Sequence, residues 1–309
     1  MLEMMMTGRK VPTGSGAFAF IAGGLNTVAV APTEKYYYDS GIVNPSVTLN
    51  GAAYENYAAA NDTQAIIYGG YLASVLQGNW TNLNWAANTT VTGAATAGNA
   101  RRNGQAFGNN LVAIFAGGIN AAENPATTSI KYTYSSRVFA AGGALTAAMR
   151  DGAAASTTAF GLLSGTVGTA GGVGRTARIY THANDTMTNS TNFTNTQYNG
   201  ATMLTSATKA VVQGGRTNAT VYGGQSYTFA DSTVANVTGL GLKKQYTAGA
   251  SNGVTGVVAG GTDDSGGGAG NMVTTDIYTH ATDVVSPGTN LGVVRRAAAG
   301  CSSVNAALT

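Results

Sequence analysis

The stretch Val254-Thr-Gly-Val-Val-Ala-Gly-Gly261 is a β-branched, apolar run that ends in a glycine pair. Five related runs occur earlier in the chain, and they end at Gly24, Gly70, Gly118, Gly165 and Gly215. Successive run ends lie 46 to 50 residues apart. An even internal period of this length, repeated six times, is typical of a repeat fold.

A second landmark follows each run: an aromatic residue, usually a threonine, and then in most copies another ring. The six copies are Tyr36-Tyr-Tyr38, Trp80-Thr-Asn82, Tyr132-Thr-Tyr134, Tyr180-Thr-His182, Tyr227-Thr-Phe229 and Tyr278-Thr-His280. Such residues favour strands. A stretch rich in Ala, Gly and Ser precedes each apolar run, and a more variable segment follows the aromatic residues. Four short strands fill each period, which predicts an all-β chain of four-stranded propeller blades.

The two ends of the chain bear on how the ring closes. Residues 295–309 repeat the first half of a period, and residues 9–24 do so as well. The chain therefore holds six periods and a surplus half-blade. Either a six-bladed ring carries a surplus segment, or another chain completes a seventh blade. We predict six blades, with residues 9–309 as one propeller domain and residues 1–8 as an N-terminal extension.

Composition narrows the partner classes. Only 9% of residues are charged and the formal net charge is +3, spread along the chain without a dense basic tract, so nucleic-acid binding is not predicted. No apolar run reaches the roughly 18 residues that span a membrane. Residues 8–31 resemble a signal peptide, but they include part of a repeat, so we expect them to be retained. The single cysteine, Cys301, excludes an intramolecular disulfide.

Candidate chemical residues are few. The two histidines, His182 and His280, occupy the repeat position that holds Tyr134 or Phe229 in other copies, which indicates packing rather than metal binding. The pair Asp263-Asp264 lies in a glycine-rich loop without the alternating acidic ligands of a calcium site. No nucleophile elbow or phosphate loop is present. We therefore predict no catalytic, cofactor-binding or metal-binding residues, and no enzyme activity.

The order of elements in each period resembles the kelch repeat. A basic residue such as Arg150 or Arg296 comes first, followed by a small-residue strand, an apolar strand ending in Gly-Gly and a Tyr-containing strand. The tryptophan usual in the fourth kelch strand is missing from nearly every copy. The segments Asp276-Ile-Tyr-Thr-His280 and Gly288-Thr-Asn-Leu-Gly-Val-Val-Arg-Arg296 look similar to kelch-like repeats in structural and tail-associated proteins of tailed bacteriophages. Copper oxidases share this fold, but their cysteine, tyrosine and histidine pattern does not carry over.

The phage resemblance implies a virion structural protein: a head decoration, tail or fibre component that contacts other virion proteins or copies of itself. The alternative is a carbohydrate- or receptor-binding propeller, adhesin-like or lectin-like, located outside the cell or at its surface and contacting a host glycan or receptor. Aromatic residues on loops would then stack on sugars, and the candidates are Tyr54, Trp85 and Tyr198. Propeller folds host many activities, so the fold does not decide between them.

Overall fold

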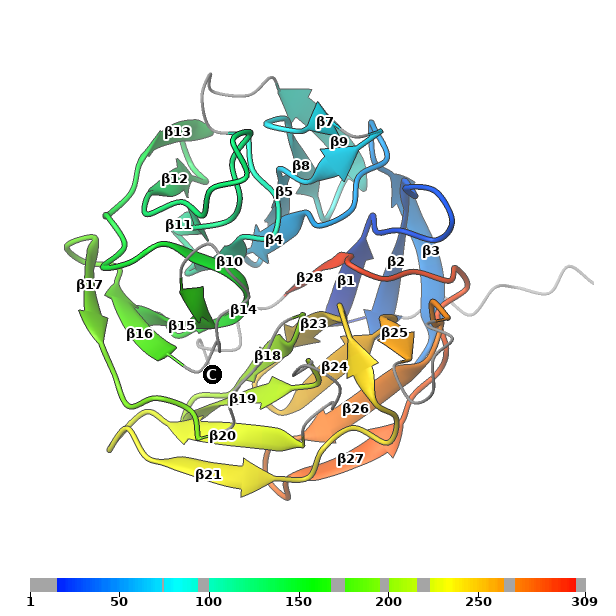
Figure 1. Ribbon diagram of the computed structural model, residues 1–309. Coiled ribbons are helices and arrows are strands. Elements are labelled where there is room, and N and C mark those ends of the chain that lie inside the picture. The colour runs from blue at the N-terminus through cyan, green and yellow to red at the C-terminus, as the bar shows by residue number, and fades with distance from the viewer. Residues whose placement is uncertain are drawn as a thin grey trace, which may run out of the picture.

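Six antiparallel sheets of four strands each surround a central axis in the computed structural model (Figure 1). The structure describes residues 16–73, 75–93, 100–167, 176–194, 200–215, 223–263 and 270–303. Within these ranges every regular element is a strand. The predicted all-β propeller of six four-stranded blades is confirmed. No helix in the described ranges has the length and apolar character needed to cross a membrane.

Each blade runs from an inner strand at the axis to an outer strand at the rim. In that order the blades are: blade 1, β28 (Ala299–Ser302), β1 (Phe18–Ala22), β2 (Pro32–Tyr37), β3 (Val43–Thr48); blade 2, β4 (Tyr57–Ala60), β5 (Gln64–Tyr68), β8 (Trp80–Asn84), β9 (Thr89–Gly93); blade 3, β10 (Gln105–Gly108), β11 (Val112–Ala116), β12 (Ser129–Thr133), β13 (Val138–Ala141); blade 4, β14 (Met149–Ser156), β15 (Phe160–Val167), β16 (Thr176–Thr181), β17 (Thr186–Asn189); blade 5, β18 (Thr202–Thr205), β19 (Lys209–Gln213), β20 (Gly224–Thr228), β21 (Val234–Val237); blade 6, β23 (Ala248–Ser251), β24 (Thr255–Ala259), β26 (Thr275–Thr279), β27 (Val284–Pro287).

Two short two-stranded sheets lie outside the blades. One is β6 (Tyr71–Leu72) with β7 (Val75–Leu76), inserted between the second and third strands of blade 2. The other is β22 (Lys244–Gln245) with β25 (Thr262–Asp263), beside blade 6.

The small-residue stretches form the inner strands, because inner strands of neighbouring blades contact one another around the axis. Gly300 of β28 shows how close they come: a Cβ there would lie 2.5 Å from the carbonyl oxygen of Gly249 in β23. Larger apolar residues fill the space between blades further from the axis. One of these inter-blade clusters contains Ile66, Tyr68, Phe115 and Tyr132.

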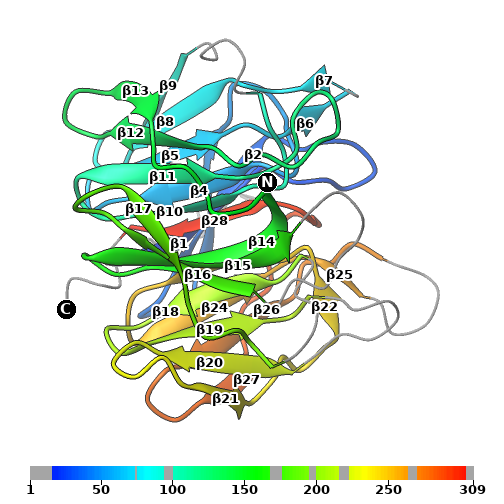
Figure 2. The same ribbon diagram turned by 60° about the vertical axis from the view of Figure 1, so that its left-hand side comes forward.

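The C-terminal half-period is not surplus, which corrects the sequence prediction. β28 pairs with β1 in antiparallel register, from Ala19 opposite Ser302 to Ala22 opposite Ala299, and so supplies the inner strand of blade 1. Figures 1 and 2 both place β28 beside β1. One strand from the end of the chain thus completes the sheet begun near its start, and no seventh blade is needed. Residues 1–15 and 304–309, which include the predicted domain boundary at residue 9, lie outside the described residues.

The glycine pairs join each blade to the next. In five blades both glycines have positive φ, for example Gly69 at 68° and Gly70 at 106°. The second glycine then donates a backbone hydrogen bond to the segment that enters the following blade, as Gly70 does to the Arg101 carbonyl oxygen at 2.8 Å. A Cβ on Gly69 would lie 2.5 Å from that same oxygen, so a side chain would separate the blades. In blade 4 the pair is Ser164-Gly165, and β15 continues past it to Val167.

Blade 2 is registered three residues later than the sequence predicted. Leu83, not Trp80, pairs with Ala65 in the way that Tyr132 pairs with Ala113 in blade 3. Trp85 therefore occupies the repeat position that holds Tyr134, His182, Phe229 or His280 in other blades, where the sequence had suggested Asn82. Its backbone nitrogen donates to the Thr63 carbonyl oxygen at 2.9 Å, just as that of His280 donates to Val254 at 3.0 Å. The Trp-Thr dipeptide imitates the repeat motif, but the strand pairing follows the buried small residue Ala65.

Candidate functional site

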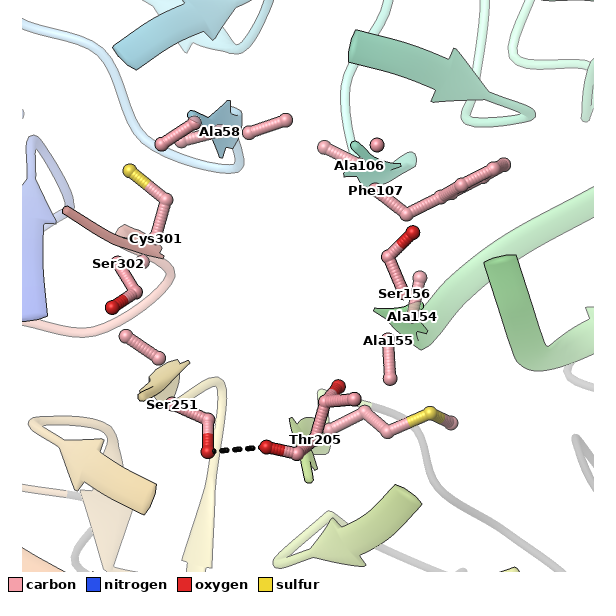
Figure 3. A pocket seen from close by; sticks show the side chains of 16 residues that line it. Ala58, Ala106, Phe107, Ala154, Ala155, Ser156, Thr205, Ser251, Cys301 and Ser302 are labelled. Atoms are coloured by element: carbon pink, nitrogen blue, oxygen red, sulfur yellow. Dashed lines mark hydrogen bonds between the residues drawn. The ribbon is translucent and has the colours of Figure 1, made fainter. Parts of the chain in front are cut away.

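A central channel is the main concave feature shared by all six blades. Its wall is made of inner-strand residues, mostly small: Ala58, Ala106, Ala154, Met203, Ala250 and Gly300 lie around it (Figure 3). Cys301 is also on this wall, and burial raises the pKa of its thiol. A wall of methyl groups and backbone offers few directional contacts, so recognition chemistry is concentrated at the two mouths of the channel.

The mouth on the glycine-pair side is bounded by a ring of backbone groups. One residue per blade adopts positive φ at or near the start of its inner strand. Five of them lie two residues before that strand, namely Glu55, Asn103, Gly200, Tyr246 and Ala297, and Asp151 lies inside β14 at a shift in strand register. Each described link in the ring is a backbone hydrogen bond from one blade to the next. These are Glu55 to Ala297 at 2.8 Å, Asn103 to Glu55 at 3.1 Å, Asp151 to Asn103 at 3.0 Å, Tyr246 to Gly200 at 2.6 Å and Ala297 to Tyr246 at 2.8 Å, donor first. The ring ties the blades together at the axis.

Two carboxyl groups stand at this mouth, which is also lined by Asn103 and Tyr246. Glu55 Oε2 forms an ion pair with Arg102 Nη1 at 2.8 Å, and Arg102 Nη2 forms a second ion pair with Glu123 Oε2 at 2.7 Å. Asp151 lies 3.4 Å from Nε of Arg150. Burial, with a smaller contribution from the nearby Glu55 charge, raises the pKa of Asp151 to about 6 against the opposing charge of Arg150. Asp151 can therefore exchange a proton near pH 6.

At the opposite mouth, serines of the inner strands contact the tyrosine or histidine that stands at the end of the third strand of the same blade. His182 Nε2 lies 3.0 Å from Ser156 Oγ, His280 Nε2 lies 2.9 Å from Ser251 Oγ, and the Tyr38 hydroxyl donates to Ser302 Oγ at 3.3 Å. Three blades thus repeat one contact, with tyrosine and histidine in the same place. Each contact ties the third strand of a blade to its own inner strand.

The two Ser–His contacts lack the third group that a catalytic triad requires. Nδ1 of His182 and Nδ1 of His280 have no hydrogen-bond partner among the described residues. Ser251 Oγ also donates to the Thr205 carbonyl oxygen at 2.7 Å, which occupies its proton (Figure 3). No group of three or more His, Cys, Asp or Glu side chains that could hold a metal ion occurs within the described ranges.

His280 should make stability depend on pH. Burial, with Lys209 nearby, lowers the pKa of His280 from 6.5 to about 4, against the opposing charge of Asp283. Between these values the unfolded chain binds a proton that the folded chain does not, so the free energy of unfolding falls as pH drops from about 6.5 to 4. His280→Gln, which is neutral throughout, should reduce this loss by up to about 3 kcal/mol. Urea titrations at pH 7 and pH 4.5 measure it; equal losses in both proteins would contradict the burial of a neutral imidazole.

The aromatic residues considered for sugar stacking lie in different environments. Trp85 packs against Phe18 and Phe20, with ring centroids 5.1 and 5.4 Å away, and its Nε1 donates to the Asn61 carbonyl oxygen at 2.8 Å. Tyr54 is partly exposed and meets Tyr71 edge to face at 5.7 Å. Tyr198 lies outside the described residues. The structure does not bring Tyr54 and Trp85 together into one surface.

Glu55 and Asp151 were not predicted as site residues from the sequence. Each stands at the same phase of the repeat, at the start of the small-residue stretch, and that phase is a signal in the sequence. Their positive φ values, 58° and 50°, could not be foreseen because neither residue is the glycine usual in that conformation.

Comparison with known proteins supports the architecture. No protein-family model and no curated protein sequence matches the chain. Among solved structures, that of YjhT matches with a TM-score of 0.69 over 90% of this chain and 99% of that chain, at 10% sequence identity. Similarity at this identity establishes the fold alone. The chain is a six-bladed β-propeller.

Proposed function

We propose that this propeller is a non-catalytic structural component of a multi-copy assembly, a bacteriophage particle, and that it acts through protein contacts at its rim. The observation that carries the proposal is the composition of the outer strands. None of the six, β3, β9, β13, β17, β21 and β27, contains Asp, Glu, Lys, Arg or His. They consist largely of Val, Thr, Ala, Ser and Asn.

This composition is unusual for the edge of a sheet. Each outer strand pairs with one neighbour only, so its other side presents backbone donors and acceptors. Soluble monomers commonly place lysine or other charges on such edges to prevent association. Here Val91, Val138 and Val284 on three outer strands are 50%, 56% and 51% exposed, with no charge on the strand. An uncharged rim of this kind suits close packing against neighbouring subunits.

Two further points agree with a structural role. The repeat sequences resemble those of phage structural and tail-associated proteins, and this resemblance favours a virion as the assembly. The described channel combines a small-residue wall with paired charges and serine-bound histidines, an arrangement that suits stability better than catalysis. The proposed partners are copies of the chain or other virion proteins.

Charges placed on the rim should weaken assembly. Val138→Lys/Val284→Lys puts two charges on outer strands, and Leu111→Lys/Val254→Lys puts two charges on exposed turns between first and second strands, where the residues are 73% and 63% exposed. We expect the rim variant to self-associate or join particles at least about tenfold more weakly, roughly 1.4 kcal/mol, with the turn variant unchanged. Light scattering and sedimentation measure the difference. Equal behaviour of the two variants would refute the rim proposal.

A further inference from the structure

A second cavity, beside the central channel, lies between blades 1 and 2. Its volume is about 240 Å³. Its wall comes from the segment 49–53 that links the two blades, from the end of β5, from the β6–β7 hairpin and from β8. This volume is below the roughly 300–1,000 Å³ of sites for drug-sized ligands, so the cavity suits a smaller molecule. The inserted β6–β7 hairpin contributes Leu72 to this wall.

The cavity wall is polar but uncharged. It contains four amide side chains and one hydroxyl, on Asn50, Asn56, Gln77, Asn79 and Thr81, and no Asp, Glu, Lys, Arg or His is among the described residues that line it. Leu49, Ile67 and Leu72 provide apolar surface. A charged ligand would lose its hydration here without gaining an opposite charge, so the wall favours a neutral ligand with many hydrogen-bonding groups.

Asn56 is the most informative residue of the wall. Its side chain is 7% exposed, and neither Nδ2 nor Oδ1 has a hydrogen-bond partner among the described residues. An unpaired buried amide costs roughly 1–3 kcal/mol. A Cβ on Gly23 would lie 2.8 Å from Nδ2, so the glycine leaves room for this amide.

The repeat shows that the fold does not require an amide at this position. Asn56 follows the positive-φ residue at the axis, and the corresponding residues in the other blades are Gly104, Gly152, Ala201, Thr247 and Ala298. All are small. Blade 2 therefore carries an extra donor and acceptor that the propeller architecture does not explain.

Three further amides have hydrogen-bonding capacity left over. Gln77 Nε2 donates to the Val75 carbonyl oxygen at 3.0 Å, and Asn79 Nδ2 reaches Gln77 Oε1 at only 3.5 Å. Asn50 Nδ2 donates to Thr92 Oγ1 at 3.1 Å. Amide oxygens accept two hydrogen bonds, so acceptor capacity remains on several sides of the cavity.

We infer that this cavity binds a neutral sugar residue, free or at the end of a glycan, with Asn56 as the central contact. Adjacent sugar hydroxyls both donate and accept, which matches the Oδ1 and Nδ2 pair of one amide. The carbon face of a pyranose ring fits against Leu49, Ile67 and Leu72. The site is distinct from Tyr54 and Trp85, and the inference does not depend on the proposed structural role.

The test uses the full chain and neutral D-glucose, D-galactose, D-mannose and N-acetyl-D-glucosamine, observed by saturation-transfer NMR. D-glucuronate serves as the charged comparison, and a glycan array distinguishes a free sugar from a terminal glycan residue. Asn56→Ala should weaken binding at least about tenfold, because the site loses its paired contact. Its melting temperature should be equal or higher, because an unpaired amide is removed.

Thr247→Ala is the matched control, because it changes the same repeat position in blade 6 and also removes a buried hydroxyl without a described partner. It should leave sugar binding unchanged. Asn79→Ala, at an exposed position on the cavity wall, provides a second variant that should weaken binding even if Asn56→Ala folds poorly. Absence of binding to every sugar and glycan, equal binding of glucuronate, or unchanged binding in both Asn variants would overturn the inference. None of these results bears on assembly through the rim.

Discussion

Deleting residues 295–309 should abolish the soluble folded state or lower its melting temperature sharply. The deletion removes β28, leaving β1 without its inner partner and exposing Phe20 and Ile21, both fully buried in the intact ring. It also removes Arg295 and the contact of β28 with β23 of blade 6. The combined loss of burial and hydrogen bonds amounts to several kcal/mol, comparable with the roughly 5–15 kcal/mol that stabilise a domain.

Thermal unfolding and light scattering measure this effect. Deleting residues 1–7, which precede the first repeat, is the control and should have a much smaller effect. Unchanged melting and solubility in both truncations would mean that the terminal strand does not close the ring.

A point substitution tests the same seam with the chain intact. Gly300→Val should force β28 away from β23, because a Cβ added at residue 300 would lie 2.5 Å from the Gly249 carbonyl oxygen. Gly223→Val is the control, because a Cβ added there would have no atom within 4 Å. We expect a cost of about 1–3 kcal/mol at residue 300 and little at residue 223.

Replacing Arg295 should give the second large loss. Its guanidinium is fully buried and donates to the carbonyl oxygens of Gly23 at 3.0 Å and Pro32 at 2.9 Å, and to Glu34 Oε2 at 2.7 Å. Arg295→Met leaves Glu34 as a buried charge without its ion-pair partner, which costs about 3–5 kcal/mol. The double variant Arg295→Met/Glu34→Met should recover much of that loss.

Urea unfolding quantifies these variants. Glu123→Gln is the comparison, since its carboxylate is 62% exposed and pairs with Arg102 at the surface; removing it should cost less than about 1 kcal/mol. A small effect of Arg295→Met, similar to that of Glu123→Gln, would show that the buried pair does not hold blade 1 to the end of the chain.

The fold could be predicted from sequence because every blade repeats the same local constraints. Glycine pairs mark the sites of positive φ, and small residues mark the inner strands, where backbones come close. The way the ring closes was harder to predict, because residues 9–24 and residues 295–309 both repeat the first half of a period. The pairing of β28 with β1 shows that the C-terminal segment supplies the inner strand of blade 1. In blade 2, Trp80-Thr81 has the sequence of the repeat motif, but Leu83 occupies the strand position that a tyrosine holds in the other blades.

The candidate sites were less predictable because they depend on contacts between blades. Asn56 is one amide among many in the sequence, and only its burial without a described partner distinguishes it. Glu55 and Asp151 come from different periods and line the same mouth of the channel, where burial and the nearby Glu55 charge raise the pKa of Asp151. The histidines were recognisable as repeat-position residues, but their serine partners lie 26 and 29 residues away along the chain.

Quantitative mass spectrometry of purified phage particles from the source culture tests the proposed function most directly. If the propeller is a structural component, the chain should be present in many copies per particle, in fixed ratio to the other particle proteins through successive density gradients. The rim variant Val138→Lys/Val284→Lys should be depleted from those particles relative to Leu111→Lys/Val254→Lys. A chain that is absent from particles and sediments as a monomer at all concentrations would contradict the proposal.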